Sequence, residues 1–469
     1  MRKISKISLV AAVAVAGFST ANAQPLEEAI KNVDVSGSVV YRYDNFHNAE
    51  KLDSNGNVTS DRENTDANRY KIGLNLSSKV NDYVKFNSRF IVGSKTTGDF
   101  ASLNAKRDGG ADGQADVSLS NAYFGLTAIP NTVVNIGKQG LTTPYTVAVD
   151  INGNEQTGTG ILALSTFGPV TAGAGYFNNT NLNESGNINS IMGITVKDLV
   201  AGAGKGKSAS LVPSFDPSTG YGIENGNVTA GVDGGSDLYV ATVQGDLDFV
   251  KLEAWYLGHQ ENFNTYTLAA TSNIDLAENA KIGLEARYVN LSLTNDGRNG
   301  LANTYNAGLG TTLTGADFEK KNEMFRFAVD GKFSIVNARL AYTKTGKNGG
   351  LTALDQDAKN TSLGWAITSN GAVDADYFQA ALGADILDNL NFTLHYGKIK
   401  AKDQTNSTKN FAVDLTDYKA QEVYGQLTYK MSKNLTTYLR YGTYEEKQVS
   451  SGDKEQDQTR GRIQVAYTF

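Results

Sequence analysis

The chain has 469 residues, 40% of them hydrophobic, with a formal net charge of −6 and no cysteine. Without cysteine it can form neither disulfide bonds nor thiolate metal sites, and its acidity without a basic patch argues against nucleic acid as a partner. A mean hydropathy of −0.34 is too polar for a bundle of membrane-spanning helices. It suits a transmembrane barrel, in which only alternate strand residues face lipid.

The first 23 residues have the features of a secretory signal peptide. Three basic residues precede a short apolar stretch from Ile7 to Phe18, and Ala21-Asn22-Ala23 supplies a small-x-small cleavage site. The apolar stretch is too short to span a bilayer, so we expect cleavage after Ala23. Removing the three basic residues changes the formal charge from −6 to about −9. Residues 24–469 are then predicted to form one outer-membrane barrel domain.

Alternation of apolar and polar residues begins at Val33 and recurs along the chain. It is clear in segments 33–43, 69–77, 84–90, 282–288 and 435–441, and this period of two predicts β-strands. Beyond Gln24 there is no run of 18 apolar residues. Any membrane insertion is therefore expected through a closed barrel.

Short and long connections alternate between the predicted strands. Eight short turns are expected near residues 80–82, 129–131, 167–169, 245–248, 277–279, 333–335, 387–389 and 431–433. A direct count gives 19 strands, but a single-chain barrel with both ends in the periplasm needs an even number. We therefore place Ile188–Val196 inside one large loop that runs from about Asn178 to Ser236. The predicted fold is all-β: an antiparallel transmembrane barrel of about 18 strands, with short periplasmic turns and long outer loops, wide enough for a water-filled lumen.

The last segment alternates strictly and ends on an aromatic residue. Ile463, Val465, Tyr467 and Phe469 share one face. A terminal strand of this kind resembles the assembly signal at the C-terminus of bacterial outer-membrane barrels. The alternative is an ordinary edge strand of a soluble sandwich.

Two stretches indicate a family. The segment Gln24–Gly37, followed by Tyr41-Arg42-Tyr43-Asp44, resembles the start of the Campylobacter-type major outer membrane porins. A second similarity is a strand that ends at Gly137-Lys138-Gln139 and is followed, after a long loop, by Gly158-Thr159-Gly160. The resemblance implies a homotrimer of 18-stranded barrels that acts as a main diffusion pore of the outer membrane.

The pore constriction is predicted in segment Gly140–Thr157, which follows the fifth predicted strand. Charged rings on such a loop and on inward strand faces select ions. The acidic side would comprise Asp150, Glu155, Glu253 and Glu285. The pore-lining basic residues would be Arg42, Arg69, Lys71, Lys85, Arg89, Arg287 and Arg440, with Arg326, Arg339 and Arg462. The alternatives are an ordinary outward loop and, for each strand charge, a merely solvated lumen residue.

No cofactor is required, but the resemblance implies that calcium could bind near the constriction. Asp150 stands at the position of the family's loop aspartate, and Asp355 or Asp357 is a second acidic loop position. Carboxylate oxygens are ligands that calcium prefers.

Enzymatic chemistry has little support in the sequence. The histidines His47, His259 and His395 are scattered, and only His395 lies clearly on a strand, on its inward face. The predicted function is general diffusion of ions and small hydrophilic solutes across the bacterial outer membrane, with weak cation selectivity. The alternative is a surface-structural or adhesive barrel with a closed lumen.

Overall fold

The structure is a computed structural model that describes most of the chain. The described residues are 33–49, 51–52, 58–60, 64–94, 99–103, 115–182, 221–224, 227–230, 235–309, 312, 314–347, 349–402, 417–449, 452 and 454–469. The predicted signal peptide and segment Ile188–Val196 lie outside these residues, so both stay predictions.

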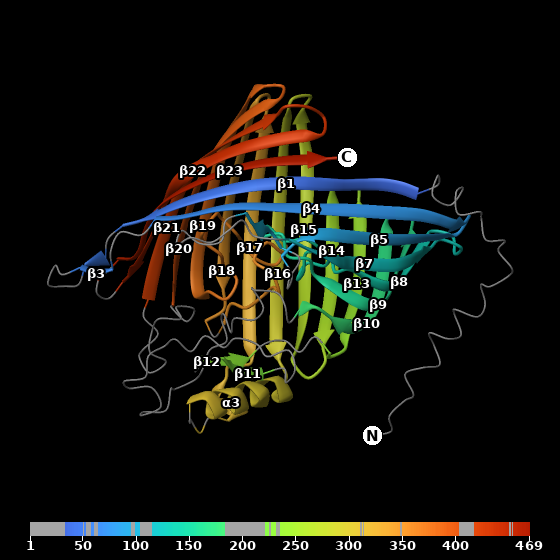
Figure 1. The fold of residues 1–469 in the computed structure, drawn as a ribbon, viewed down its shortest axis with the longest axis horizontal. Coiled ribbons are helices and arrows are strands. Elements are labelled where there is room, and N and C mark those ends of the chain that lie inside the picture. Colours follow the sequence, from blue (N-terminus) through green and yellow to red (C-terminus); the bar gives the residue numbers. More distant parts are fainter. Residues whose placement is uncertain are drawn as a thin grey trace.

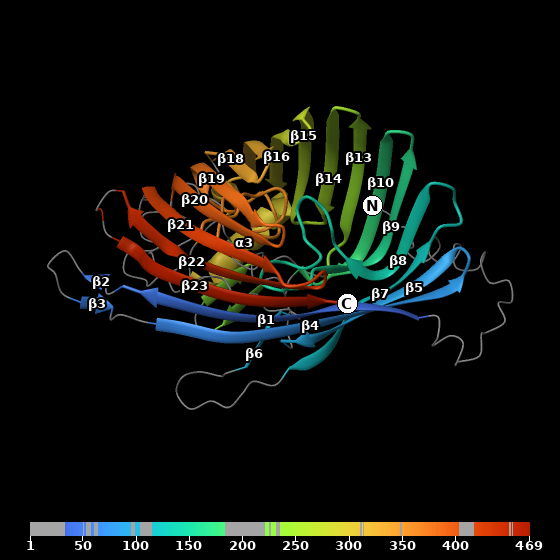
Figure 2. The same ribbon diagram turned by 90° about the horizontal axis from the view of Figure 1, so that it is seen from above.

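Eighteen long antiparallel strands of the described chain form one closed barrel, as predicted. They are β1 (Val33–Asn48), β4 (Asn64–Asn81), β5 (Val84–Gly93), β7 (Asp116–Leu126), β8 (Thr132–Gly140), β9 (Thr157–Phe167), β10 (Val170–Thr180), β13 (Leu238–Leu247), β14 (Val250–His259), β15 (Phe263–Ala277), β16 (Ala280–Leu293), β17 (Lys321–Phe333), β18 (Val336–Thr345), β19 (Val373–Leu387), β20 (Leu390–Lys402), β21 (Asp417–Lys430), β22 (Leu435–Gln448) and β23 (Lys454–Thr468). The first strand pairs with both β4 and the last strand, β23, which closes the sheet on itself (Figure 2). Closure leaves no unpaired edge, as a strand-built membrane protein requires.

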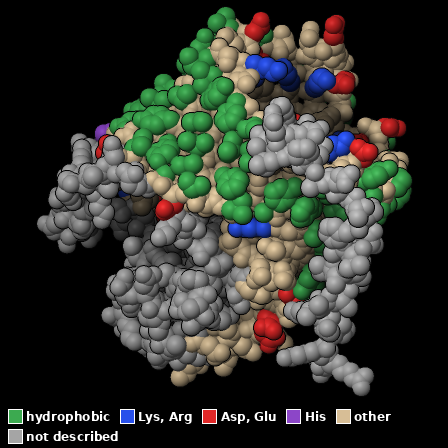
Figure 3. Space-filling view, turned by 45° about the vertical axis from the view of Figure 1, so that its right-hand side comes forward, with side chains coloured by type: hydrophobic (Ala, Val, Ile, Leu, Met, Phe, Trp, Pro, Cys, Tyr) green, Lys and Arg blue, Asp and Glu red, His purple; other side chains and the backbone are tan. Residues whose placement is uncertain are grey.

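Apolar residues of the strands face outward, which decides between a barrel and a soluble sandwich. On β1, Val39 and Tyr41 are each 38% exposed, whereas Arg42 is only 5% exposed. The same contrast holds on β23, where Ile463 is 42% exposed and Arg462 is 7% exposed. The outward residues form an apolar belt across the flank of the barrel (Figure 3). The hydrocarbon of a membrane would cover such a belt.

Short turns join strands at one end of the barrel, and all eight lie where the sequence predicts them. Several turn residues adopt positive φ, among them Asn131 (56°), Gly168 (57°), Asp248 (49°) and Ser334 (54°). Tight hairpin turns require this backbone conformation, which glycine, asparagine and aspartate tolerate best.

Longer connections join strands at the other end, and some carry structure of their own. Between β10 and β13 lies the hairpin β11 (Tyr221–Glu224) and β12 (Asn227–Ala230). The strand β10 continues to Thr180, so the loop begins three residues after the predicted start at about Asn178. Helix α3 (Asn295–Leu309) and the 3-10 turn η2 (Gly315–Asp317) join β16 to β17, and α3 lies beside the β11–β12 hairpin (Figure 1).

The described chain also contains very short strands. These are β2 (Lys51–Leu52), which pairs with β3 (Val58–Ser60), and β6 (Ala101–Ser102), which pairs with β4. None of the described helices has the length and apolar character needed to cross a membrane.

The terminal aromatic residue, Phe469, contacts β1 where the first and last strands of the barrel pair. The backbone N–H of Gly37 donates to the carbonyl of Phe469 at 2.9 Å, and the N–H of Phe469 donates back at 3.1 Å. A Cβ on Gly37 would lie 2.7 Å from the Phe469 ring, so only glycine lets that ring approach β1 so closely. The ring also stacks on Tyr467 at 5.8 Å.

Candidate functional site: the lumen constriction

The predicted constriction loop folds inward and is tied to the barrel wall. We call residues 141–156, between β8 and β9, the first inner loop. Its Glu155 forms ion pairs with Lys71 on β4 (2.5 Å) and Arg89 on β5 (3.0 Å), and it accepts a hydrogen bond from Ser120 on β7 (2.8 Å). Burial alone would raise the pKa of Glu155, but Arg89 and Lys71 hold it below its usual value. The carboxylate therefore stays ionised and fastens the loop to three strands.

Asp150 shapes the tip of the same loop. Its Oδ1 accepts backbone N–H bonds from Asn152 (2.8 Å) and Asn154 (2.7 Å), and its Oδ2 accepts one from the Asn154 side chain (2.5 Å). This is the local bonding by which aspartate stabilises a turn. Arg42 on β1 reaches the turn as well, donating to the Ile151 carbonyl at 2.9 Å.

A second connection also folds into the lumen, and the sequence did not predict it. We call the described residues 346–347 and 349–372, between β18 and β19, the second inner loop. Arg326 on β17 donates to the Lys359 carbonyl at 2.8 Å and forms an ion pair with Glu285 on β16 at 2.7 Å. Asn360 donates to Thr267 on β15 at 2.7 Å. Buried carbonyls in this loop thus find donors on the wall, as buried backbone must.

The two inner loops are bonded to each other. The N–H of Leu354 donates to the Tyr145 carbonyl at 2.8 Å, and the N–H of Asn360 donates to the Pro144 carbonyl at 2.9 Å. Gln156 also donates to the Asp355 carboxyl group. Tyr145 and Leu354 both belong to one apolar cluster that fills this part of the lumen. The loops therefore act as one narrowing element.

The three predicted metal ligands come close enough to influence one another. Burial raises the pKa of Asp355, and the neighbouring Asp357 and Asp150 raise it further; burial, with Asp357, raises that of Asp150 too. Asp357 Oδ1 is buried without a hydrogen-bond partner. Such a cluster favours a proton or a cation. Even so, no group of three or more carboxylate or histidine side chains in the described residues is arranged to hold a metal ion.

The remaining predicted charges lie on inward strand faces, and several are paired. Glu285 also pairs with Arg287 (2.9 Å), and Glu253 lies 3.8 Å from Lys359 of the second inner loop. Asp44 on β1 pairs with Arg462 (2.5 Å) and Arg69 (3.2 Å). Acidic and basic residues thus form pairs with each other and do not stand only on opposing sides.

Two predicted basic residues have other surroundings. Lys85 is exposed near the start of β5 and away from the described contacts of the inner loops. Arg440 on β22 lies over Tyr424, with 5.0 Å from its guanidinium carbon to the ring centroid. His395 stacks on the same ring at 4.5 Å, on the inward face as predicted.

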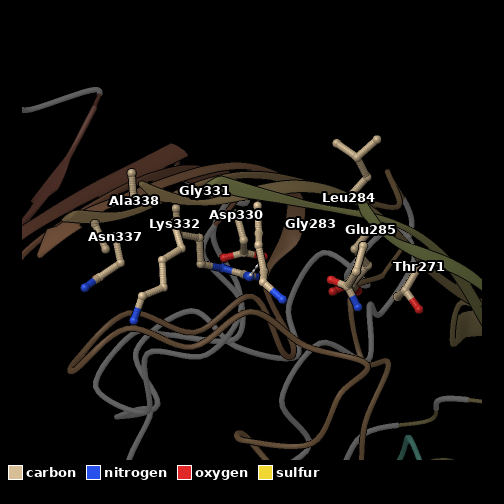
Figure 4. A pocket seen from close by; sticks show the side chains of 13 residues that line it. Thr271, Gly283, Leu284, Glu285, Asp330, Gly331, Lys332, Asn337 and Ala338 are labelled. Carbon is tan, nitrogen blue, oxygen red and sulfur yellow. Dashed lines mark hydrogen bonds and ion pairs between the residues drawn. The ribbon is translucent and has the colours of Figure 1, made fainter. Parts of the chain in front are cut away.

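Two cavities lie along the barrel wall, and one of them adjoins both inner loops. One of about 490 Å³ lies between the second inner loop and the wall, where Arg326, Arg339, His395, Glu422 and Arg440 line it. Another of about 580 Å³ lies along β15–β19, with Glu285 and Asp330 in its lining (Figure 4). Figure 4 shows Glu285 and Leu284 pointing to opposite sides of the sheet, which places the charge in the lumen.

Comparisons with known proteins agree with this architecture. The sequence matches the family described as Campylobacter major outer membrane protein over residues 1–469. Among curated proteins, no match was found.

Similar solved structures are outer-membrane porins. Pseudomonas aeruginosa OccK8 (OprE) has a TM-score of 0.61 at 15% identity, covering 94% of this chain and 98% of that one. Acinetobacter baumannii OccAB1 has a TM-score of 0.60 at 14% identity, covering 93% and 96%. Pseudomonas aeruginosa OpdK, solved with vanillate, has a TM-score of 0.57 at 12% identity, covering 93% and 98%. At these identities the likeness concerns the fold. Together with the family match over the whole sequence, it leads to one conclusion: the chain belongs to the Campylobacter major outer membrane protein family and forms a porin barrel of the bacterial outer membrane.

Proposed function

We propose that this porin is a general diffusion channel for ions and small hydrophilic solutes. The observation that carries the proposal is that the two inner loops narrow the lumen while cavities with polar linings remain along the barrel wall. Polar and charged side chains line a cavity of about 490 Å³ beside those loops and another of about 580 Å³ along strands β15–β19. A charged and hydrated passage of this kind admits polar solutes and disfavours apolar ones.

Weak cation selectivity is part of the proposal. Its support is the formal net charge of −6, which becomes more negative if the signal peptide is removed. Ion pairing limits the effect, because Glu155 and Glu285 are each neutralised by two basic side chains. The test is the reversal potential of the refolded protein in a planar bilayer under a potassium chloride gradient. A small potential of the sign for cations supports the proposal; a zero or anion-selective potential refutes this part of it.

We further propose that the channel is a homotrimer embedded in outer-membrane lipid, with no enzymatic activity and no nucleic acid partner. The homotrimer rests on the family to which the chain belongs. Chemical cross-linking of the detergent-solubilised, unheated protein should yield a species of three chains. A species that stops at one chain, from protein that conducts in a bilayer, would refute the trimer.

Calcium binding at Asp150, Asp355 and Asp357 stays a proposal. Its support is the mutual influence of these carboxyl groups, together with the unpartnered Asp357 oxygen. Because the three side chains do not form a ready metal site, binding would need added oxygen ligands from backbone or water. Calcium titration of the wild type and of Asp355→Asn by calorimetry tests this. Heat released by the wild type alone supports the site, and equal or absent heats refute it.

A surface-structural or adhesive role is the second candidate. The observation in its favour is the group of α3 and the β11–β12 hairpin at the end of the barrel opposite the short turns. In outer-membrane barrels the longer connections face outside the cell. Adhesion with a closed lumen predicts no conductance, so the bilayer experiment separates the two functions.

A further inference from the structure

The tip of the second inner loop crosses to wall strands far from its own ends. Residues 363–368 form a tight hairpin, with Leu363 bridged to Thr368 and the N–H of Gly364 donating to the Ile367 carbonyl at 2.8 Å. The loop starts at β18 and ends at β19. Its tip, however, contacts residues of β1, β21, β22 and β23.

One carboxylate on the wall receives this tip. Glu422 on β21 is 2% exposed. Its two oxygens accept backbone N–H bonds from Trp365 (3.1 and 3.2 Å) and Ala366 (2.7 Å). Hydrogen bonds to an ionised acceptor are stronger than neutral ones. Glu422 thus satisfies consecutive N–H groups of a buried turn.

Gly364 makes this contact sterically feasible. A Cβ added to Gly364 would lie 1.5 Å from Glu422 Oε1, closer than any real contact. The carboxylate and the turn therefore fit only while residue 364 has no side chain. An alanine there would displace the carboxylate without removing its charge.

The Trp365 ring attaches the tip to the wall through three arginine side chains, and this contact depends on the Glu422 carboxylate. Its ring is 9% exposed. The guanidinium carbons of Arg440, Arg460 and Arg462 lie 5.2, 5.0 and 6.0 Å from the ring centre. Three guanidinium groups around one ring repel each other, and Glu422 acts electrostatically on both Arg440 and Arg460. The carboxylate therefore offsets that repulsion as well as binding the backbone.

The wall offers the described tip few other polar anchors. Gln379 on β19 donates to the Leu363 carbonyl at 3.0 Å, and the Tyr377 hydroxyl donates to the Ile367 carbonyl at the long distance of 3.5 Å. The firm wall bonds at residues 359–362 lie nearer the base of the loop. Loss of Glu422 should therefore loosen the turn at Trp365 and Ala366, while Ile367 stays in its apolar cluster with Tyr377 and residues 359–362 stay in place.

We infer that Glu422 is a positioning residue that holds the tip of the second inner loop across the lumen and thereby sets the largest solute the channel admits. This inference rests on the proposed function as a diffusion channel. It assigns the size limit to one contact between loop and wall.

The test compares Glu422→Ala, Glu422→Gln and Gly364→Ala with two matched controls. Glu445→Gln removes a carboxylate from an exposed pair with Lys447 on β22. Gly245→Ala adds a Cβ whose nearest neighbour is 3.9 Å away. Each variant is reconstituted in liposomes, and its permeability to oligosaccharides of increasing size is measured by swelling.

A second readout follows the tip itself. The chain has two tryptophans, so in a Trp255→Phe background Trp365 is the sole indole reporter. Quenching of its fluorescence by acrylamide should rise in Glu422→Ala and Gly364→Ala. It should rise less in Glu422→Gln, whose amide oxygen can still accept N–H bonds from the turn. The controls should match the wild type.

The outcomes separate this inference from the proposed function. Passage of larger sugars by Glu422→Ala and Gly364→Ala, with greater quenching, supports the inference. Unchanged size limits and quenching in both folded variants overturn it, although the channel remains. A wild type that passes no sugar refutes the diffusion channel itself. If Glu422→Ala does not fold, Gly364→Ala, which keeps the carboxylate, decides.

Discussion

Replacing Glu155 by glutamine should loosen the first inner loop and shift the channel towards anions. The carboxylate faces Lys71 and Arg89, whose side chains are only 6% and 15% exposed. Removing one partner of a buried ion pair costs about 3–5 kcal/mol. We expect the lower end of that range, since Arg89 keeps its bond to Asn75 and Lys71 keeps its bond to the Gly153 carbonyl.

Two measurements follow from that magnitude. In a bilayer under a salt gradient, the reversal potential of Glu155→Gln should move towards anion selectivity, because two buried cations lose their counter-charge. The open-channel current should also become noisier as the loop leaves the wall. The control is Glu445→Gln, whose exposed pair contributes at most about 1 kcal/mol. An unchanged reversal potential with a quiet current would refute the role given to Glu155.

Three further predictions concern the carboxyl cluster and the barrel seam. Burial and its acidic neighbours raise the pKa of Asp355, so folding favours its protonated form. The free energy of unfolding should therefore fall as the pH rises from the ordinary aspartate pKa of about 3.9 towards the raised value. Thermal unfolding should show this fall in the wild type and less of it in Asp355→Asn. In Asp150→Asn, cation selectivity should decrease, because a negative charge leaves the tip of the first inner loop, and an unchanged reversal potential would show that this tip does not line the ion path. Deleting Phe469 removes both backbone bonds to Gly37 and should lower the yield of folded, heat-modifiable barrel in refolding assays. A normal yield would show that the contact between Phe469 and β1 is not needed for folding.

The barrel could be predicted because its pattern is local. On each strand a lipid-facing residue alternates with a lumen-facing one, so Val39, Tyr41 and Arg42 already reveal two faces in the sequence. Turn residues such as Asn131 and Gly168 mark the short connections for a similar local reason. Strand number then followed from the parity of a barrel with both ends on one side.

The second inner loop could not be predicted in the same way. Its burial depends on contacts with residues distant in sequence, such as Arg326 with Thr361 and Glu422 with Trp365. A polar, glycine-containing segment looks the same in sequence whether it points out or in. One signal was available: Leu354, Trp365 and Ile367 are large apolar residues in a connection that should be hydrated if it faced solvent.

Pairing within the constriction was also beyond the sequence. Alternation placed Glu285, Arg287 and Arg326 inward, but only the register of β16 and β17 sets Arg287 directly opposite Arg326, with Glu285 between their guanidinium groups. Register between strands depends on the whole barrel, which a single strand does not encode.

Single-channel recording of the refolded protein without its first 23 residues shows directly whether the barrel is an open, water-filled channel. We expect discrete conductance steps that persist at low voltage, in groups of three if the channel is a homotrimer. A silent bilayer, from protein that is folded and heat-modifiable, would contradict the diffusion channel and favour the adhesive barrel with a closed lumen.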